Sequence, residues 1–170
     1  TQLDNVQQIH KAGGHLLELN NDNLDLAKVE AGGIKLDIEA VNPKGLIEEC
    51  MALTQALAEP QGIIVKAPLL ENGLPTILAD RTRFKQVLLN LTSNAVKYNH
   101  TGGTVTLDCA PLNNAMIRFT VTDTGTGIPV DKHGDLFEPF KRLDAENGTV
   151  RGTGIGLTIT KNLIEMMQGS

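Results

Sequence analysis

Two asparagines and a lysine share one face of a predicted helix in the middle of this chain. Apolar side chains recur at three- and four-residue steps over residues 80–98, and Asp80 suits the N-cap of such a helix. Asn90, Asn94 and Lys97 follow at i, i+4 and i+7, which aligns them over about two turns. Because asparagine is a poor helix former, this face indicates either a binding site or an exposed polar surface.

Two glycine loops follow this helix. The first, DTGTGIP at residues 123–129, comes after an alternating apolar run and is predicted to end a strand. The second, GTGIGL at residues 152–157, opens another predicted helix. Glycine lets the backbone approach a ligand closely, and free N–H groups at a helix N-terminus suit phosphates. Each loop alone is weak evidence for a nucleotide site.

The ordered set of asparagine helix, DxGxG, FEPF at 137–140 and GTGIGL is far more specific than any one of its parts. It resembles the N, G1, F and G2 boxes of the ATP-binding domain of sensor histidine kinases. The resemblance runs from about Ile34 to the end, and residues 1–33 resemble the second helix of that family's dimerisation and phosphotransfer domain. It implies transfer of the γ-phosphate of Mg-ATP to a histidine of a dimerisation domain, for relay to a response regulator.

The resemblance also implies roles for individual residues. Asn94 corresponds to the magnesium ligand, Asn90 supports metal and phosphates, and Lys97 offers a point charge to phosphate, so these three are the expected catalytic residues. Asp123 corresponds to the carboxylate that reads the adenine amino group, although an aspartate before glycine is also a common turn cap. The complete set of expected nucleotide-binding residues is Asn90, Asn94, Lys97, Tyr98, Asp123, Gly125, Gly127, Ile128, Lys141, Arg142, Gly152, Thr153, Gly154, Ile155, Gly156 and Leu157.

Some of these residues have a second interpretation. Tyr98 packs either on the adenine or ribose side or in the core, and Lys141 either reaches phosphate or is a solvated charge. Phe137 and Phe140 are expected to pack and to anchor a loop over residues 141–151.

Position 90 separates kinases from hydrolases in the same superfamily. Gyrase, mismatch-repair and heat-shock chaperone ATPases carry glutamate four residues before the metal asparagine, as a base for water. Here that residue is Asn90, which cannot take a proton from water. A neutral imidazole needs no such base because it is already nucleophilic, so the sequence favours a kinase.

One other function stays open, and a second is disfavoured. The chain could be a nucleotide-binding or interaction module without kinase activity of its own. An anti-sigma-factor serine kinase is disfavoured by the stretch LDLAKVEAGG, which resembles the histidine-kinase link between stem and ATP domain.

Composition limits the remaining classes. A net charge of -5 argues against a nucleic-acid surface, and the chain contains no P-loop motif. Cys50 and Cys109 lie far apart and are predicted to be ordinary thiols of a reducing compartment. No apolar run is long enough to span a bilayer, so we expect a cytoplasmic domain, with any membrane anchor upstream of Thr1.

The predicted fold is an α/β (α+β) two-layer sandwich, preceded by a long N-terminal helix. Strands are expected at 34–41, 63–66, 76–79, 104–109 and 116–122, and helices at 43–58, 80–98 and 154–167. Leu46, Ile47, Cys50, Leu53 and Leu57 form the expected buried stripe of the first of these helices. This order predicts one mixed sheet with helices on one face, over domain 34–170. The family's two last strands are not expected here.

The N-terminal segment 1–33 is predicted to be part of a dimerisation stem. His10 and His15 lack the family's H-E-x-x-x-P setting, so the phosphoacceptor helix is expected to be absent and the chain alone to be inactive in autophosphorylation. Asn20 falls on the heptad seam with Asn23 beside it. Buried amides weaken such a seam, so residues 1–31 are expected to form a weak homodimer at most.

Overall fold

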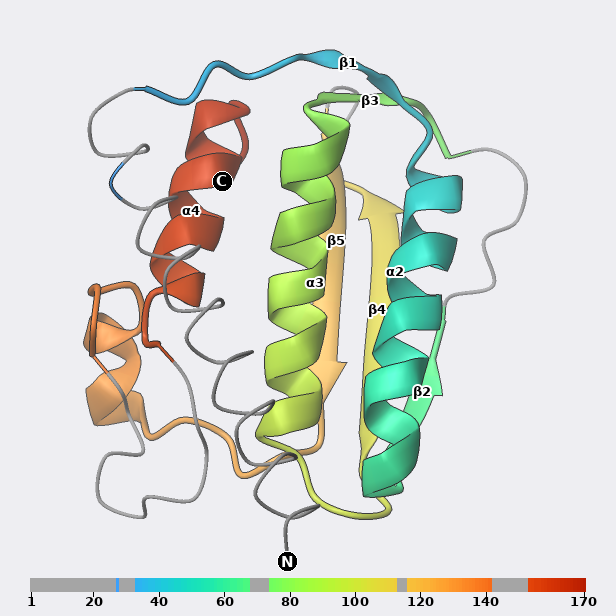
Figure 1. Cartoon of the computed structure of the whole chain (residues 1–170), viewed down its shortest axis with the longest axis vertical. Helices are drawn as coiled ribbons and strands as arrows, with labels where there is room; N and C mark the ends of the chain where they lie inside the picture. The colour runs from blue at the N-terminus through green and yellow to red at the C-terminus, as the bar shows by residue number, and fades with distance from the viewer. Residues whose placement is uncertain (1–26, 28–32, 68–73, 113–115, 142–152) are drawn as a thin grey trace, which may run out of the picture.

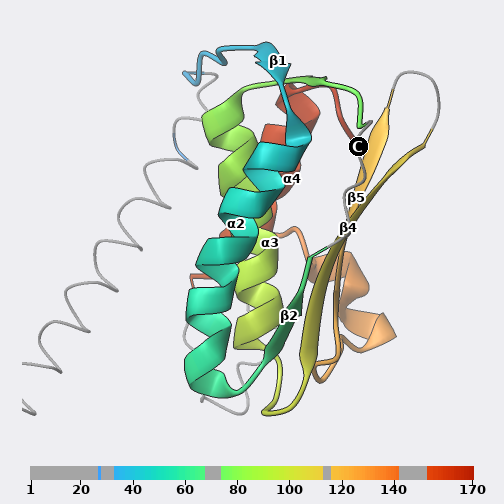
Figure 2. The ribbon, with the colours of Figure 1, turned by 90° about the vertical axis from the view of Figure 1, so that its right-hand side faces the viewer.

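The computed structural model describes residue 27 and residues 33–67, 74–112, 116–141 and 153–170. Three helices cover one face of a sheet, which gives the two layers seen edge-on in Figure 2. The helices are α2 (Pro43–Ala58), α3 (Arg81–Lys97) and α4 (Gly156–Met166), with short 3-10 turns η1 (Glu59–Gln61) and η2 (Val130–Asp135). The predicted stem helix and the Asn113–Asn114 turn lie outside the described residues, as does nearly all of the loop 141–151.

The described strands form two sheets where the sequence predicted one. In the larger sheet, β2 (Ile64–Lys66) pairs parallel with β4 (Thr104–Pro111), which pairs antiparallel with β5 (Ile117–Asp123). In the smaller sheet, β1 (Glu39–Val41) pairs antiparallel with β3 (Ile77–Ala79) across the ends of the helices (Figure 1). The mixed sheet and its helical layer confirm the predicted fold class.

Local sequence explains where the helices begin. The Asn42 side chain accepts a hydrogen bond from the Lys44 N–H at 3.0 Å, and Pro43 occupies the first turn of α2, where its missing N–H costs nothing. The Asp80 side chain accepts from the Arg83 N–H at 3.0 Å at the start of α3. Both predicted helix starts are therefore correct.

The core lies between the helices and the larger sheet. Val105 and Leu107 of β4 point toward the helices and are fully buried, whereas Asp108 on the other face of the strand is exposed. This alternation is expected for a sheet that is covered on one face only. Phe84 of α3 meets Phe119 of β5 edge to face, with ring centroids 4.9 Å apart.

Two sequence predictions about local structure are wrong. Leu53 and Leu57 were expected in the buried stripe of α2 but are 45% and 51% exposed, because α2 contacts α3 and the sheet through the neighbouring face that contains Thr54. The first strand is also shorter than predicted, since residues 34–38 precede β1 without a strand partner. In the described part of the chain, no helix combines the length and the apolar character needed to cross a bilayer.

Candidate functional site

Three segments that are distant in the sequence meet at one end of the helical layer (Figure 1). They are the C-terminal half of α3, the glycine loop after β5 and the N-terminus of α4. The Thr126 N–H bonds the Tyr98 carbonyl oxygen at 3.4 Å, which joins the first glycine loop to the end of α3. The Phe140 N–H donates to the Gly154 carbonyl oxygen at 3.1 Å, which ties the FEPF segment to the second glycine loop. The structure therefore brings the predicted motifs together.

Asn90 bridges α3 and α4. Its Nδ2 donates to Thr160 Oγ1 at 2.6 Å. Its Oδ1 lies beside Gly156, where an ideal Cβ would be only 2.5 Å from that oxygen. A larger residue at the first position of α4 would therefore force the Asn90 side chain to move, and glycine leaves room for it.

Asn94 lies one turn further along α3, and it differs from Asn90 in its bonding. Its side chain is half-buried and makes no hydrogen bond with the residues that the structure describes. An amide oxygen of this kind is a hard, neutral ligand for metal ions such as Mg²⁺. At the end of the same helix, the Lys97 ammonium lies 5.5 Å from the centroid of the Tyr98 ring, so these two side chains pack on each other.

The first glycine loop is held by its own aspartate. Asp123 Oδ1 accepts the Gly125 N–H at 2.8 Å, so the turn-cap interpretation is correct for that oxygen. A Cβ at Gly125 would collide with the Tyr98 carbonyl oxygen, and Gly127 has a φ of +70°. Asp123 itself is exposed at the end of β5, because its strand is at the edge of the sheet. Ile128, five residues after the last paired position, is exposed as well.

The second glycine loop leads into α4 without a side-chain cap. Gly154 has a φ of +73°, and the Ile155 N–H bonds Thr153 Oγ1 at 3.3 Å. The N-terminal N–H groups of α4 are consequently not satisfied by a capping side chain. The Ile155 side chain is fully buried with Val87, Ile159 and Leu163, so it is a core residue, and the Leu157 side chain is half-buried. Arg142 and Gly152 lie outside the described residues.

Lys141, in the segment between the two glycine loops, forms ion pairs with two carboxylates. Lys141 Nζ lies 2.8 Å from Asp135 Oδ1 and 2.8 Å from Glu138 Oε2. Hydrogen bonds to Asp135 and then to Glu138 raise the pKa of Lys141 above its ordinary value, although all three side chains are exposed. In this conformation Lys141 points to the η2 segment.

The two phenylalanines are less buried than predicted. Phe137 is 45% and Phe140 64% exposed, and Phe140 has a φ of +64°, a region that side chains rarely adopt. The segment is anchored through its backbone instead, since Thr158 Oγ1 donates to the Phe137 carbonyl oxygen at 2.9 Å. The Lys161 ammonium lies 5.4 Å from the Phe137 ring centroid.

Thr158 and Thr160 are the site residues that sequence reasoning missed. Both are buried on α4, and each holds a neighbouring part of the site. The available signal was the placement of two threonines in the first turns of an otherwise apolar helix face. Their partners lie 21 and 70 residues away in the sequence, so no local spacing indicates them.

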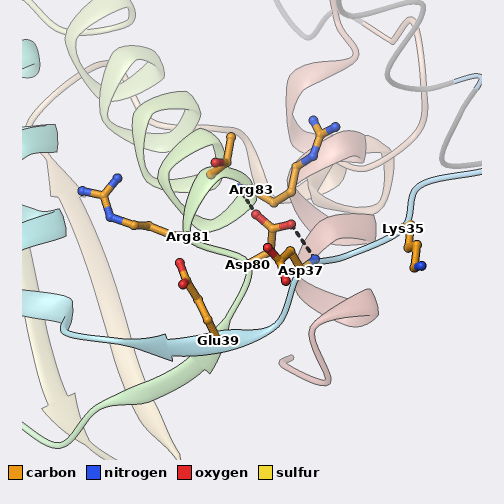
Figure 3. A pocket seen from close by; sticks show the side chains of 7 residues that line it. Lys35, Asp37, Glu39, Asp80, Arg81 and Arg83 are labelled. Atoms are coloured by element: carbon orange, nitrogen blue, oxygen red, sulfur yellow. Dashed lines mark hydrogen bonds between the residues drawn. The ribbon is translucent and has the colours of Figure 1, made fainter.

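A hollow of about 270 Å³ lies at the opposite end of α3. Its lining combines three cations, three carboxylates and a hydroxyl, from Lys35, Asp37, Glu39, Asp80, Arg81, Thr82 and Arg83. Figure 3 shows Asp80 between two backbone donors, with Oδ1 bonded to the Arg83 N–H and Oδ2 to the Asp37 N–H, both at 3.0 Å. None of the predicted nucleotide-binding residues lines this hollow. Across the described ranges, no group of three or more His, Cys, Asp or Glu side chains is arranged to hold a metal.

Comparison with known proteins identifies the family. The family described as histidine kinase-, DNA gyrase B-, and HSP90-like ATPases matches residues 79–170, more than half of the chain, and the chain belongs to it. It is an ATP-binding catalytic domain of the histidine-kinase type.

Individual relatives agree with this assignment. The chain is 40% identical over 167 residues to the non-motile and phage-resistance protein of Caulobacter vibrioides, covering 96% of this chain and 20% of that protein. It is 36% identical over 171 residues to the cell-division control histidine kinase PdhS of Brucella suis, covering 95% of this chain and 16% of that protein. Full-length ShkA, solved in complex with AMPPNP, superposes with a TM-score of 0.85 at 36% identity, covering 99% of this chain and 35% of ShkA. The chain thus spans a fifth or less of the Caulobacter and Brucella proteins and about a third of ShkA.

Proposed function

We propose that this chain binds Mg-ATP between the C-terminal half of α3, the first glycine loop and the N-terminus of α4, and transfers the γ-phosphate to a histidine. The observation that carries the proposal is the convergence of these three segments. A face with two amides meets a glycine loop that carries a carboxylate and a helix N-terminus without a side-chain cap.

Asp123 is the proposed adenine contact. One of its oxygens is used by the Gly125 N–H, and the carboxylate is otherwise exposed, so its second oxygen is available to an amino group. In this position a single side chain would shape the loop and also read the base. The neighbouring Ile128 and Tyr98 would supply apolar surface beside the base.

The phosphates are proposed to lie at the N-terminus of α4. Uncapped N–H groups and the positive end of the helix dipole both favour an anion there. Gly154 and Gly156 allow the backbone to approach closely. Lys97, Lys141 and Arg142 are proposed to supply positive charge, and Lys141 would first have to leave Asp135 and Glu138.

The Asn94 amide is the proposed magnesium ligand. Its oxygen fits that ion because it is a hard donor with no hydrogen bond to the described residues. When bound, Mg²⁺ would neutralise phosphate charge and complete its shell with phosphate oxygens and water. Since the amide side chains of the protein are neutral, they would add no charge to the complex of Mg²⁺ and triphosphate.

The reaction we propose is phosphoryl transfer to an imidazole nitrogen. The nitrogen forms a bond to the γ-phosphorus while the bond to the β,γ-bridging oxygen breaks, and ADP leaves. Asn90 offers no base, and a neutral imidazole requires none. The work of the chain's own residues is therefore positioning and electrostatic stabilisation.

The remaining parts of the system are also proposals. Residues 1–33 would be part of a dimerisation stem, with a weak homodimer at most, and residues 34–170 the catalytic domain. A separate histidine domain would accept the phosphate, and a response regulator would receive it next. We place these events in the cytoplasm, where ATP is available.

The test is transfer of labelled phosphate from ATP to an added dimerisation domain that carries an H-box histidine. We expect acid-labile, magnesium-dependent label on the partner histidine with this chain, and none with Asn94→Ala. Thr122→Ala, on the outer face of β5, is the matched control and should retain transfer. Nucleotide binding without any transfer would instead indicate a binding module, and label on His10 or His15 would contradict our interpretation of the stem.

A further inference from the structure

The Thr160 hydroxyl accepts a hydrogen bond from the Asn90 amide across the contact between α3 and α4. We infer that Thr160 is a positioning residue, which holds Asn90 against the start of α4 so that the carbonyl oxygen of the amide, and not its NH₂ group, is presented to the metal-bound triphosphate. The inference rests on the proposed function, because the orientation of Asn90 matters for a nucleotide only if Mg-ATP binds at this site.

An asparagine amide needs such a partner. Its oxygen and nitrogen ends are nearly equal in size, so packing cannot distinguish them, and hydrogen bonds together with the local electrostatic potential decide which end points where. A rotation by half a turn would replace an acceptor with two N–H donors. Those donors would repel a cation or compete with its water ligands, so a wrongly oriented amide would oppose metal binding.

The nitrogen end of Asn90 donates to Thr160. Because a hydroxyl can also donate, this bond fixes where the amide lies, and the start of α4 decides which of its ends faces Thr160. The distance from Asn90 Nδ2 to Thr160 Oγ1 is 2.6 Å, and Thr160 is only 7% exposed. The bond is part-buried, so it is less exposed to competition from water than a surface hydrogen bond. It joins two helices that pack on each other, so the amide is held relative to α4 as well as to α3.

The oxygen end is favoured by the start of α4. Asn90 Oδ1 lies beside Gly156, the first residue of that helix, where uncapped N–H groups create a positive potential. This potential favours a carbonyl oxygen over an NH₂ group. Oδ1 makes no hydrogen bond with the described residues and adjoins the proposed phosphate site, so it is available to a ligand.

Asn94 has no comparable support among the described residues. Its amide can rotate until a metal binds, and binding would then cost the rotational entropy of this side chain. Asn90 would lose less, because its hydrogen bond to Thr160 already restrains it. The pair would therefore consist of one preorganised amide and one adaptable amide, one helical turn apart.

The experiment compares magnesium-dependent nucleotide affinity in four versions of the whole chain. Calorimetry measures the affinity for a non-hydrolysable ATP analogue, with excess Mg²⁺ and with a chelator, and the ratio of the two is the magnesium gain. Thr160→Val removes the hydroxyl at nearly constant shape, and Thr160→Ser restores it. Thr92→Val removes a buried hydroxyl from α3 that bonds Thr54 instead, so it controls for lost stability.

We expect Thr160→Val to lose on the order of tenfold of the magnesium gain, as is typical when a supporting partner of a metal ligand is removed. Its affinity in chelator should stay unchanged, and Thr160→Ser and Thr92→Val should keep the full gain. The side-chain amide protons of Asn90, assigned by their loss in Asn90→Ala, should move in Thr160→Val to the positions of exposed asparagines and remain in place in Thr160→Ser.

The outcomes separate the two proposals. A wild-type magnesium gain in Thr160→Val overturns the inference and leaves the proposed function standing. A wild-type chain that does not bind the analogue, or binds it without any magnesium gain, overturns the proposed function. If Thr160→Val does not fold, Gly156→Ala displaces Asn90 Oδ1 from the other side, and an unchanged gain in that variant overturns the inference.

Discussion

The polar side chains at the two ends of α3 differ in how many hydrogen bonds they make within the protein. At the N-terminal end, both oxygens of Asp80 accept backbone hydrogen bonds (Figure 3), and Glu49 of α2 pairs with Arg81 and Lys85. At the other end, Asn94 makes no hydrogen bond with the described residues, and Asn90 uses only its nitrogen. The Asp80 carboxylate is thus satisfied where the helix must be held, whereas the amide oxygens of Asn90 and Asn94 have no bonded partner among the described residues where a ligand is proposed to bind.

This difference leads to separate expectations for stability and for binding. Changes at the Asp80 end should lower the free energy of unfolding and leave nucleotide affinity unchanged. Changes to the ligand-facing groups at the other end should weaken nucleotide binding and leave the free energy of unfolding almost unchanged. Groups that make no intramolecular hydrogen bond contribute little to folding.

The largest expected effect is on stability, in Asp80→Ala. It removes the cap of α3 and the bond to the Asp37 N–H, and we expect a loss of about 2–3 kcal/mol in urea unfolding. Asp80→Asn keeps a capping oxygen and should lose roughly half as much. Equal stability of all three proteins would show that the Asp80 end does not hold the helix.

Asp123→Asn should weaken nucleotide binding without lowering stability, whereas Asp80→Ala should lower stability without weakening binding. Loss of a charged acceptor should weaken ATP-analogue binding by about 1–3 kcal/mol in calorimetry, with the unfolding midpoint unchanged. Asp108→Asn, an exposed carboxylate on β4 of the same sheet, is the control and should bind normally. Unchanged affinity in Asp123→Asn would remove the adenine assignment.

Acid should weaken the Asp80 end selectively. Burial raises the pKa of Asp80, but hydrogen bonds from the N–H groups of Arg83, Asp37 and Thr82 outweigh burial and lower it below its ordinary value of 3.8. A carboxylate with a lowered pKa contributes stability that is present above its unfolded pKa and is lost as pH falls through the folded one. The stability difference between wild type and Asp80→Asn should therefore be constant near neutrality and shrink below about pH 4. A difference that is independent of pH would contradict this.

The smallest expected effect concerns the ion pairs between α2 and α3. Glu49 is solvent-accessible, and its hydrogen bond to Lys85 lowers its pKa, with desolvation acting in the opposite direction and Arg81 adding to the lowering. Exposed pairs are screened by salt. Glu49→Gln should therefore lower the unfolding midpoint slightly at low ionic strength and not at all at high salt. A large loss that persists in salt would mean that these pairs matter as much as Asp80.

Sequence alone determined the features of this protein that depend on a few neighbouring residues. The cap at Asp80, the helix start at residue 43, and the shared face of Asn90 and Asn94 follow from short-range geometry, and all were predicted. The order of the motifs, read beside this geometry, was enough to identify the family.

Only the tertiary structure decided which side chains are covered and which are bonded. Leu53 and Leu57 continue the apolar pattern of α2, yet they are exposed because α3 and the sheet pack against the neighbouring face. Lys141 pairs with carboxylates, and the two amides of α3 differ because Thr160 reaches only Asn90. These outcomes depend on contacts between segments up to 70 residues apart, and the periodicity of one helix carries no information about the helix that will pack against it.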